Sequence, residues 1–195
     1  GNPSSVYKAG RIARAALDQA REQVAQLVGV QPAQVIFTSG ATEANNTALK
    51  GVMALAGKDA ALVLGEIEHS SVRETAKALQ RAHHRVISVA PDANGLVTPD
   101  AVVVAMPADT ALVSVMLANN ETGAIQDVQA ISALARSKGA LVHTDAVQAA
   151  GKIPLHFPSL GAHLMSLSAH KLYGPKGVGA LIVDKRVAFE QFKQN

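Results

Sequence analysis

Short apolar runs alternate with stretches of helical periodicity along most of the chain, and this alternation restricts the possible folds. The apolar runs are continuous and are not interleaved with polar residues, which is typical of strands buried on both faces. Helical patterns separate most of the runs, as they do in βαβ units. The sequence therefore predicts an α/β fold, a three-layer sandwich in which helices cover both faces of a mostly parallel sheet.

The element boundaries follow from the apolar runs and from capping residues. We expect strands at residues 35–38, 60–64, 85–89, 111–117, 140–144, 164–167 and 180–183. We expect helices at residues 6–28, from the turn 39–43 to about 56, at 70–82, a short one from 98, and at 127–138. Ser70 or Ser71, Thr98 and Asp127 are the expected helix N-caps. No helix separates the last two strands, so an antiparallel pair is expected there.

The composition supports this fold and excludes several function classes. Apolar residues make up 48% of the 195 residues and aromatic residues only 3%, so the core must consist of aliphatic side chains. The net charge of +3 is spread along the chain without a basic block, which argues against nucleic-acid binding. The absence of cysteine excludes disulfides and thiolate metal sites within these residues.

Neither a membrane segment nor a targeting segment is recognisable. No apolar run approaches the ~18 residues of a membrane-spanning helix. The first residues, GNPSS, lack the charged and apolar regions of a signal peptide. We therefore expect a cytoplasmic protein that has no membrane partner.

Polar residues cluster where the predicted strands end. In an open parallel sheet, ligands bind at the carboxyl ends of strands. The residues that follow the successive apolar runs, and that should meet at one edge, are Gly40, Ala41, Thr42, Glu68, His69, Asn119, Asn120, Asp145, Gln148, Ser168, His170 and Lys171.

Lys171 is the most informative of these residues. It follows a short apolar run within Ser-x-His-Lys and precedes a glycine-rich turn. A lysine so placed suits an enzyme that uses pyridoxal phosphate (PLP), because such an enzyme needs an amine to bond the cofactor aldehyde. Asp145, at the end of a neighbouring strand, could pair with the pyridine nitrogen. Taken alone, Lys171 would suit an ordinary surface loop, and Asp145 would suit the end of any strand.

The remaining candidates fit the same ligand, although each would also suit a structural role. Ala41 and Thr42 open a helix directly after a strand, where free N–H groups can bind a phosphate. His69 could stack on a flat ring, and Asn120 and Gln148 could bond its hydroxyl region. Other motifs fail on inspection: the glycines form no phosphate loop or dinucleotide fingerprint, and the seven histidines form no H-E-x-x-H metal site.

With these residues assembled, the chain closely resembles the cysteine desulfurases, in the class V aminotransferase group of fold-type I PLP enzymes. The matching segments occur in the family's order along nearly the whole chain. They are NPSS at 2–5, FTSGATE at 37–43, Glu68-His69, NNETG at 119–123, HTDAVQ at 143–148 and SLSAHKLYGPKG at 166–177.

The resemblance assigns a role to each candidate. It implies that Lys171 is the Schiff-base lysine, that Asp145 pairs with the pyridine nitrogen, and that His69 stacks on the ring and takes part in acid/base steps. It also implies that Gln148 contacts the phenolic oxygen and Asn120 the cofactor or substrate. The phosphate-binding residues would be Ala41, Thr42, Ser168 and His170.

The resemblance also implies an activity. A cysteine desulfurase converts L-cysteine to L-alanine and passes the sulfur on as a persulfide for iron–sulfur cluster or thio-cofactor synthesis. Such enzymes are homodimers, and a sulfur-acceptor or scaffold protein is a further expected partner. We expect residues 1–195 to form the PLP-binding large domain, without the family's N-terminal segment and small C-terminal domain. The alternatives are a selenocysteine lyase, another PLP-dependent lyase or aminotransferase-like enzyme, or a non-catalytic scaffold with this fold.

Overall fold

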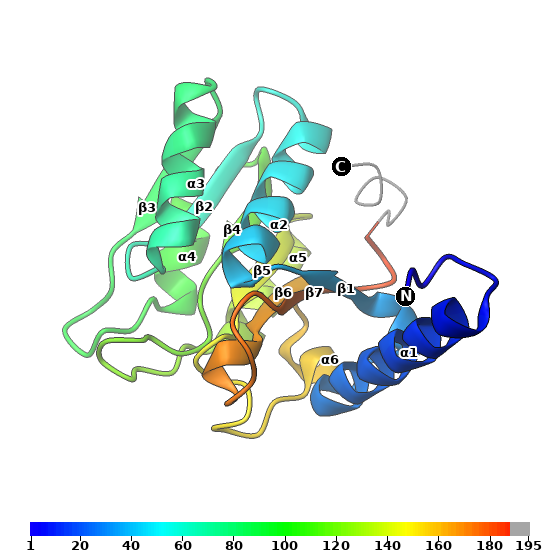
Figure 1. Ribbon diagram of the computed structural model, residues 1–195. Coiled ribbons are helices and arrows are strands. Elements are labelled where there is room, and N and C mark those ends of the chain that lie inside the picture. The colour runs from blue at the N-terminus through cyan, green and yellow to red at the C-terminus, as the bar shows by residue number, and fades with distance from the viewer. Residues whose placement is uncertain (188–195) are drawn as a thin grey trace.

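The structure is a computed structural model in which residues 1–187 are described, and it contains one seven-stranded sheet (Figure 1). The strand order is β1-β7-β6-β5-β4-β2-β3. The strands are β1 (Val35–Thr38), β2 (Ala61–Gly65), β3 (Arg85–Val89), β4 (Thr110–Ser114), β5 (Leu141–Asp145), β6 (Leu164–Ser168) and β7 (Gly179–Val183). The last eight residues of the predicted domain, 188–195, lie outside the described part.

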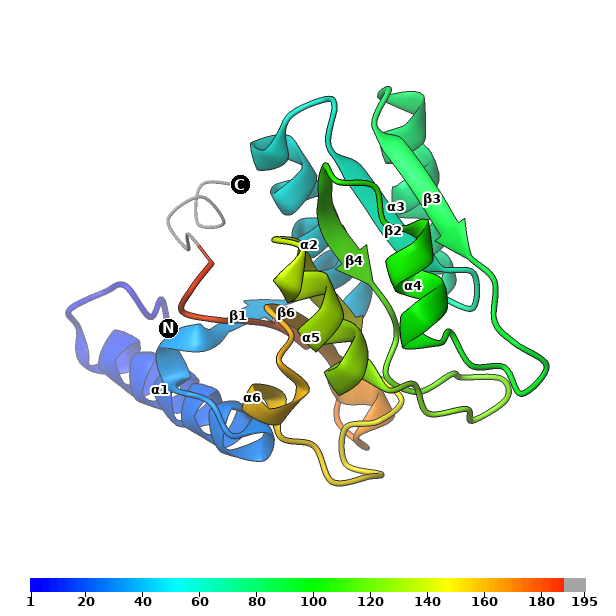
Figure 2. The same cartoon turned by 180° about the vertical axis from the view of Figure 1, so that it is seen from behind.

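Helices cover both faces of the sheet, as the sequence predicts. The α-helices are α1 (Lys8–Val28), α2 (Ala41–Ala56), α3 (Ser70–Arg81), α4 (Pro99–Ala105), α5 (Val128–Ser137) and α6 (Phe157–Leu160), and the 3-10 helices are η1 (Pro32–Gln34) and η2 (Ala169–Lys171). Figures 1 and 2 show α2 and α3 on one face and α4 and α5 on the other. The predicted three-layer α/β fold is therefore confirmed.

The core consists of two apolar clusters, one on each face of the sheet. Successive residues of β7 alternate between them: Ala180 and Ile182 join the cluster with α1, α4, α5 and α6, whereas Leu181 and Val183 join the cluster with α2 and α3. All residues of β2, β6 and β7 are buried. The predicted burial on both faces is only partly met by β3, which forms one edge of the sheet: Val86 and Ile87 are partly buried against opposite clusters, whereas Arg85 and Ser88 are exposed.

The strand directions bring most carboxyl ends to one edge. Strands β2 to β6 are parallel to their neighbours, and β7 is antiparallel to both β6 and β1. Two inversions make β1 parallel to β6, so the carboxyl ends of six strands, β1 to β6, share an edge with the start of β7. The chain order reverses between β2 and β4, and such a reversal marks the preferred ligand-binding crevice of an open α/β sheet.

Two predicted boundaries are wrong. The strand expected at 111–117 ends at Ser114, although Val115 and Leu117 still donate to carbonyls of β5; on the other side, the Met116 N–H donates to the side chain of Glu68. The expected cap of α3 is neither Ser70 nor Ser71: the ring of His69 accepts from the Ser71 N–H, and both serines lie in the first turn. Thr98 and Asp127 cap α4 and α5 as predicted. Helix α6 was not expected from the sequence.

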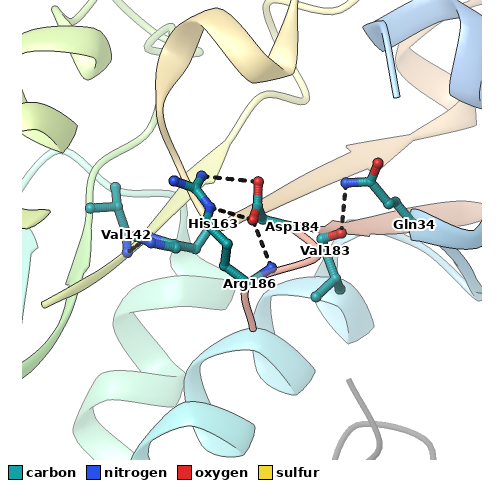
Figure 3. A network of polar contacts seen from close by, with 6 residues as sticks. All are labelled: Gln34, Val142, His163, Val183, Asp184 and Arg186. Atoms are coloured by element: carbon teal, nitrogen blue, oxygen red, sulfur yellow. Dashed lines mark hydrogen bonds and ion pairs between the residues drawn. The ribbon is translucent and has the colours of Figure 1, made fainter. Parts of the chain in front are cut away.

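Side-chain contacts to the backbone tie the strands together at the opposite edge of the sheet (Figure 3). The Gln34 amide donates to the Val183 carbonyl at 3.1 Å, which joins the start of β1 to the end of β7. His163 Nδ1 accepts from the Val142 N–H at 3.0 Å, and burial lowers the pKa of His163 to about 4. Asp184 accepts from the Arg186 guanidinium. None of these residues was predicted for the functional site.

Within residues 1–187, no helix is both long and apolar enough to cross a membrane. The same residues contain no group of three or more histidine or acidic side chains arranged to hold a metal ion.

Candidate functional site

A pocket of about 500 Å³ lies at the carboxyl edge of the sheet. Every residue to which the sequence analysis assigned a contact with the ligand lines it: Ala41, Thr42, His69, Asn120, Asp145, Gln148, Ser168, His170 and Lys171. Glu68 and Asn119, which were expected at the same edge, do not line it. The lining residues that the sequence analysis did not propose for the site include Ser39, Glu43, Met116, Val147, Lys176 and Gly177. The structure thus brings together residues from five strand ends.

One end of the pocket is built around the N-terminus of α2. Gly40 is the N-cap and has no side chain, so it leaves the first-turn N–H groups of Ala41 and Thr42 free for a ligand. Across the same end, the Ser168 hydroxyl and His170 Nδ1 lie 2.8 Å apart in a hydrogen bond. Free amides and the helix dipole suit an anion such as a phosphate group.

The close approach of two glycines positions this helix start. A Cβ on Gly179, at the start of β7, would stand 2.6 Å from the Gly40 Cα and 2.8 Å from the Leu167 carbonyl oxygen. No side chain fits there, so β7 and the turn before α2 can pack directly together. The glycine at position 179 is therefore explained by this close backbone contact, and no nucleotide-binding motif is needed to explain it.

Asp145 forms the rear wall of the pocket at the end of β5 and is only 4% exposed. Its Oδ2 accepts from the Asn45 amide at 2.8 Å, and its Oδ1 accepts from the Val147 N–H at 3.0 Å. Burial raises the pKa of Asp145, and these two hydrogen bonds act in the opposite direction. A cationic partner in the pocket would stabilise the ionised carboxylate, so the position suits a protonated ring nitrogen.

A second buried carboxyl group lies behind the site. Glu68 is 2% exposed, its Oε1 accepts from the Met116 N–H, and its Oε2 has no hydrogen-bond partner among the described residues. Burial, with a smaller contribution from Asp145, raises the pKa of Glu68 well above its usual value. The bond to Met116 joins the loop after β2 to the segment after β4, which fixes the two sides of the crevice.

Hydrogen bonds fix the orientation of His69 at the start of α3. Its Nδ1 accepts from the Ser71 N–H at 3.2 Å and lies 2.8 Å from the Ser71 Oγ. The amide of the fully buried Asn45 donates to the same Oγ at 2.9 Å. One hydrogen-bonded chain therefore runs from His69 through Ser71 and Asn45 to Asp145.

The side-chain amides of Asn119 and Gln148 make different hydrogen bonds near the pocket. Asn119 donates to the Ile67 carbonyl at 3.0 Å and accepts from the N–H groups of Glu121 and Thr122, so it shapes the turn that presents Asn120. The Gln148 Oε1 accepts from Lys152 at 2.6 Å, which leaves the amide nitrogen of Gln148 as the donor available to the pocket.

Lys171 ends η2, the single turn that follows β6. The Leu172 N–H and the Gly174 N–H both donate to the Ala169 carbonyl, at 2.8 and 2.9 Å, and this tight turn directs the chain back toward β7. Lys171 and Lys176 consequently approach the pocket from one loop. The site combines an amine, an anion-binding helix start and a buried carboxyl group, which fits the aldehyde, phosphate and pyridine nitrogen of PLP.

Asn45 and Ser71 are the important residues that the sequence reasoning missed. Asn45 lies on the buried stripe of α2, next to Ala44, Ala48 and Leu49. A polar residue at a core position of an otherwise apolar stripe is the signal that could have identified it. Ser71 was assigned only as an alternative helix cap.

Comparison with known proteins is consistent with this geometry. The sequence pattern of the aminotransferase class-V family matches residues 1–194. The chain is 47% identical over 188 residues to the cysteine desulfurase IscS of Aeromonas hydrophila, covering 95% of this chain and 46% of that protein. It is 44% identical over 186 residues to the cysteine desulfurase IscS of Dictyoglomus turgidum, covering 95% and 47%.

Solved structures of similar proteins share both fold and sequence with this chain. A NifS-like protein superposes with a TM-score of 0.92 at 41% identity, covering 96% of this chain and 52% of that one. The structure of SspA in complex with cysteine superposes with a TM-score of 0.90 at 35% identity, covering 94% and 53%. The chain thus spans about half the length of the relatives it matches. Class-V aminotransferases use PLP as their cofactor. The match over residues 1–194 shows that this chain belongs to the aminotransferase class-V family.

Proposed function

We propose that this chain is the cofactor-binding part of a PLP-dependent cysteine desulfurase. The observation that carries the proposal is the convergence of Lys171, Asp145 and the start of α2 on one pocket. The cysteine desulfurases among its relatives, at 47% and 44% identity, favour this reaction over others of the family.

Each part of the pocket would hold one part of the cofactor. The amides of Ala41 and Thr42 would bind the phosphate. Asp145 would pair with the ring nitrogen, and Lys171 would bond the aldehyde carbon. The other contacts would be the His69 ring against the cofactor ring, Gln148 at the phenolic oxygen, Asn120 at the cofactor or substrate, and Ser168 and His170 at the phosphate.

When bound, PLP supplies an electron sink that stabilises negative charge at the α-carbon of an amino acid. The amine of Lys171 is the base in this pocket that would take the α-proton of the substrate. The carboxylate of Asp145 would keep the ring nitrogen protonated, which sustains the electron sink. The N-terminus of α2 would anchor the phosphate and so fix the ring between these two residues.

The overall reaction requires a thiol that these residues do not contain. L-cysteine and a thiol RSH give L-alanine and the persulfide RSSH, so the C–S bond breaks, an S–S bond forms, and no external oxidant is needed. The 195 residues include no cysteine. The accepting thiol must therefore come from another segment or another protein.

The partners and the location stay predictions. We propose that two copies of the chain associate, which is supported by large apolar residues exposed at and before the start of α1, namely Val6, Tyr7 and Ile12. A sulfur-acceptor or scaffold protein is proposed as a partner because the family resemblance implies one, and a cytoplasmic location is proposed as the default.

Exchange of the substrate α-proton in D₂O tests the proposal. The chain is loaded with PLP, and deuterium incorporation at the α-carbon of L-cysteine and L-alanine is followed by NMR. We expect exchange that the Lys171→Ala variant abolishes and that Asp184→Asn, at the opposite edge of the sheet, retains. A loaded chain that exchanges neither amino acid would instead be a non-catalytic scaffold. Faster exchange with selenocysteine than with cysteine would favour a selenocysteine lyase.

A further inference from the structure

The donors around His69 determine which ring nitrogen carries the proton. The Ser71 backbone N–H can only donate, and it points at Nδ1 over 3.2 Å. Nδ1 must therefore act as an acceptor, and in the neutral ring the proton lies on Nε2. His69 caps α3 through this bond, so the helix start itself orients the ring.

The Ser71 hydroxyl reinforces this arrangement. Its oxygen accepts from the Asn45 amide at 2.9 Å, so its own hydrogen is free to point at His69 Nδ1, 2.8 Å away. The orientation of the amide is also determined, because the Asn45 nitrogen donates to the Asp145 carboxylate at 2.8 Å. The reverse orientation would set the Asn45 carbonyl oxygen against that carboxylate.

One amide thus serves two residues of the pocket. Asn45 is fully buried, and its Oδ1 has no hydrogen-bond partner among the described residues. Leaving a buried amide oxygen without a hydrogen-bond partner costs stability, whereas the amide nitrogen donates both to Ser71, which orients His69, and to Asp145 in the pocket. We propose that Asn45 and Ser71 are positioning residues that hold His69 as an Nε2–H donor toward the pocket and fix the Asp145 carboxylate through the same amide.

This inference deepens the proposed function and rests on it, because it gives His69 the role of a neutral hydrogen-bond donor to the bound ligand. The Ser71 backbone N–H is a donor only, so the position facing it is suited to the unprotonated Nδ1. The geometry therefore points away from a proton-accepting role for Nδ1 and leaves Nε2 as the nitrogen that can contact the pocket.

The tautomer of His69 can be measured without any cofactor. Long-range ¹H–¹⁵N NMR of the ¹⁵N-labelled chain distinguishes protonated from unprotonated ring nitrogens. We expect the Nε2–H tautomer in the wild type, and a shift of about fivefold toward Nδ1–H in Ser71→Ala, equivalent to the loss of one hydrogen bond. The matched control is Ser70→Ala, at the exposed neighbouring position, which should leave the tautomer unchanged. An Nδ1–H tautomer in the wild type, or no shift in Ser71→Ala, would overturn the inference.

A second measurement separates this inference from the proposed function. PLP binding is titrated by absorbance for the wild type, Ser71→Ala, Ser71→Thr and Asn45→Ala, after circular dichroism has shown that each variant folds. We expect tenfold or greater weakening in Asn45→Ala, weakening in Ser71→Ala, and rescue by threonine, which keeps the hydroxyl. Unchanged binding in both Ser71→Ala and a folded Asn45→Ala would contradict the positioning roles. A wild type that has the expected tautomer but binds no PLP would refute the proposed function alone.

Discussion

Gly40 and Gly179 lie in direct backbone contact, and a Cβ on Gly179 would stand 2.6 Å from the Gly40 Cα. This contact joins the start of β7 to the turn from which α2 begins. The helix start that would bind the phosphate is therefore set by a residue that lies far away in the sequence.

The substitution Gly179→Ala should displace the turn at Gly40. We expect a loss of about 1–3 kcal/mol in the free energy of unfolding, typical of an overpacked site, together with much weaker PLP binding. Gly57→Ala at the end of α2 is the control, because the φ of +88° at Gly57 should also make the substitution destabilising while the space around it is open. Urea unfolding and PLP titration check both variants. If Gly179→Ala bound PLP as tightly as Gly57→Ala, the contact would not position the phosphate site.

The buried histidine His143 should make the protein sensitive to acid. Its two ring nitrogens lie 2.9 Å from the Ser114 Oγ and 3.0 Å from the Ser166 Oγ, so it links β4, β5 and β6. Burial lowers the pKa of His143 from 6.5 to about 3. In the unfolded chain the ring binds a proton below pH 6.5, whereas in the folded chain it does not. The contribution that the neutral His143 ring makes to the stability of the fold is therefore fully present above pH 6.5, and it is lost as the pH falls toward 3.

Each pH unit in that window should cost up to about 1.4 kcal/mol of unfolding free energy for this one residue. We expect His143→Gln to have a shallower loss of stability than the wild type between about pH 6 and 4, measured by urea unfolding at several pH values. His83→Gln, at an exposed position, should retain the wild-type slope. The comparison isolates His143, because the other buried titratable groups are common to all three proteins. Identical slopes in the wild type and His143→Gln would show that the ring is not the group responsible.

The charge of Asp145 should be needed to bind PLP, beyond the shape of its side chain. We expect Asp145→Asn to weaken PLP binding by roughly 10- to 100-fold, because a hydrogen bond to a charged partner contributes about 1.5–3 kcal/mol. The variant should also lose α-proton exchange, since an unprotonated ring is a poor electron sink. Absorbance titration and NMR exchange measure the two effects, with Asp184→Asn as the control carboxylate. Wild-type values for Asp145→Asn in both assays would remove Asp145 from this role.

The apolar residues around the start of α1 should mediate self-association. Tyr7 is 77% exposed and Ile12 is 61% exposed, which is unusual for large apolar side chains grouped in one region. We expect a dimer at micromolar concentration by sedimentation velocity, and a shift toward monomer in the variant Tyr7→Asp/Ile12→Glu. Val104→Glu, at a valine on α4 that is 86% exposed, should remain dimeric. A monomeric wild type would contradict the proposed association.

Two features could be predicted from the sequence because they depend on local patterns. They are the layers of the fold and the edge of the sheet at which the site lies. Continuous apolar runs indicated buried strands, and the rule for strand ends brought residues as distant as Ala41 and Lys171 to one pocket. The antiparallel pairing of the last two strands was also predictable, since no helix separates them. The roles of the individual pocket residues stay predictions.

Features that depend on long-range contacts were not predictable. Asn45 bonds Ser71 and Asp145, which lie 26 and 100 residues further along the chain. The cap of α3 was assigned to a serine because serine is a common cap, whereas the fold places the His69 ring there. Just after β4, the Met116 N–H bonds to Glu68, a side chain that is distant in the sequence. Local propensity contains no information about such partners.

The most direct test of the central claim is to locate the lysine that bonds PLP. The chain is loaded with PLP, reduced with borohydride, digested and analysed by peptide mass mapping, with Lys171→Ala and Lys176→Ala treated in parallel. We predict one phosphopyridoxyl adduct, on Lys171, which persists in Lys176→Ala and disappears in Lys171→Ala. An adduct on Lys176 or another lysine, or no adduct in the wild-type chain, would contradict the account.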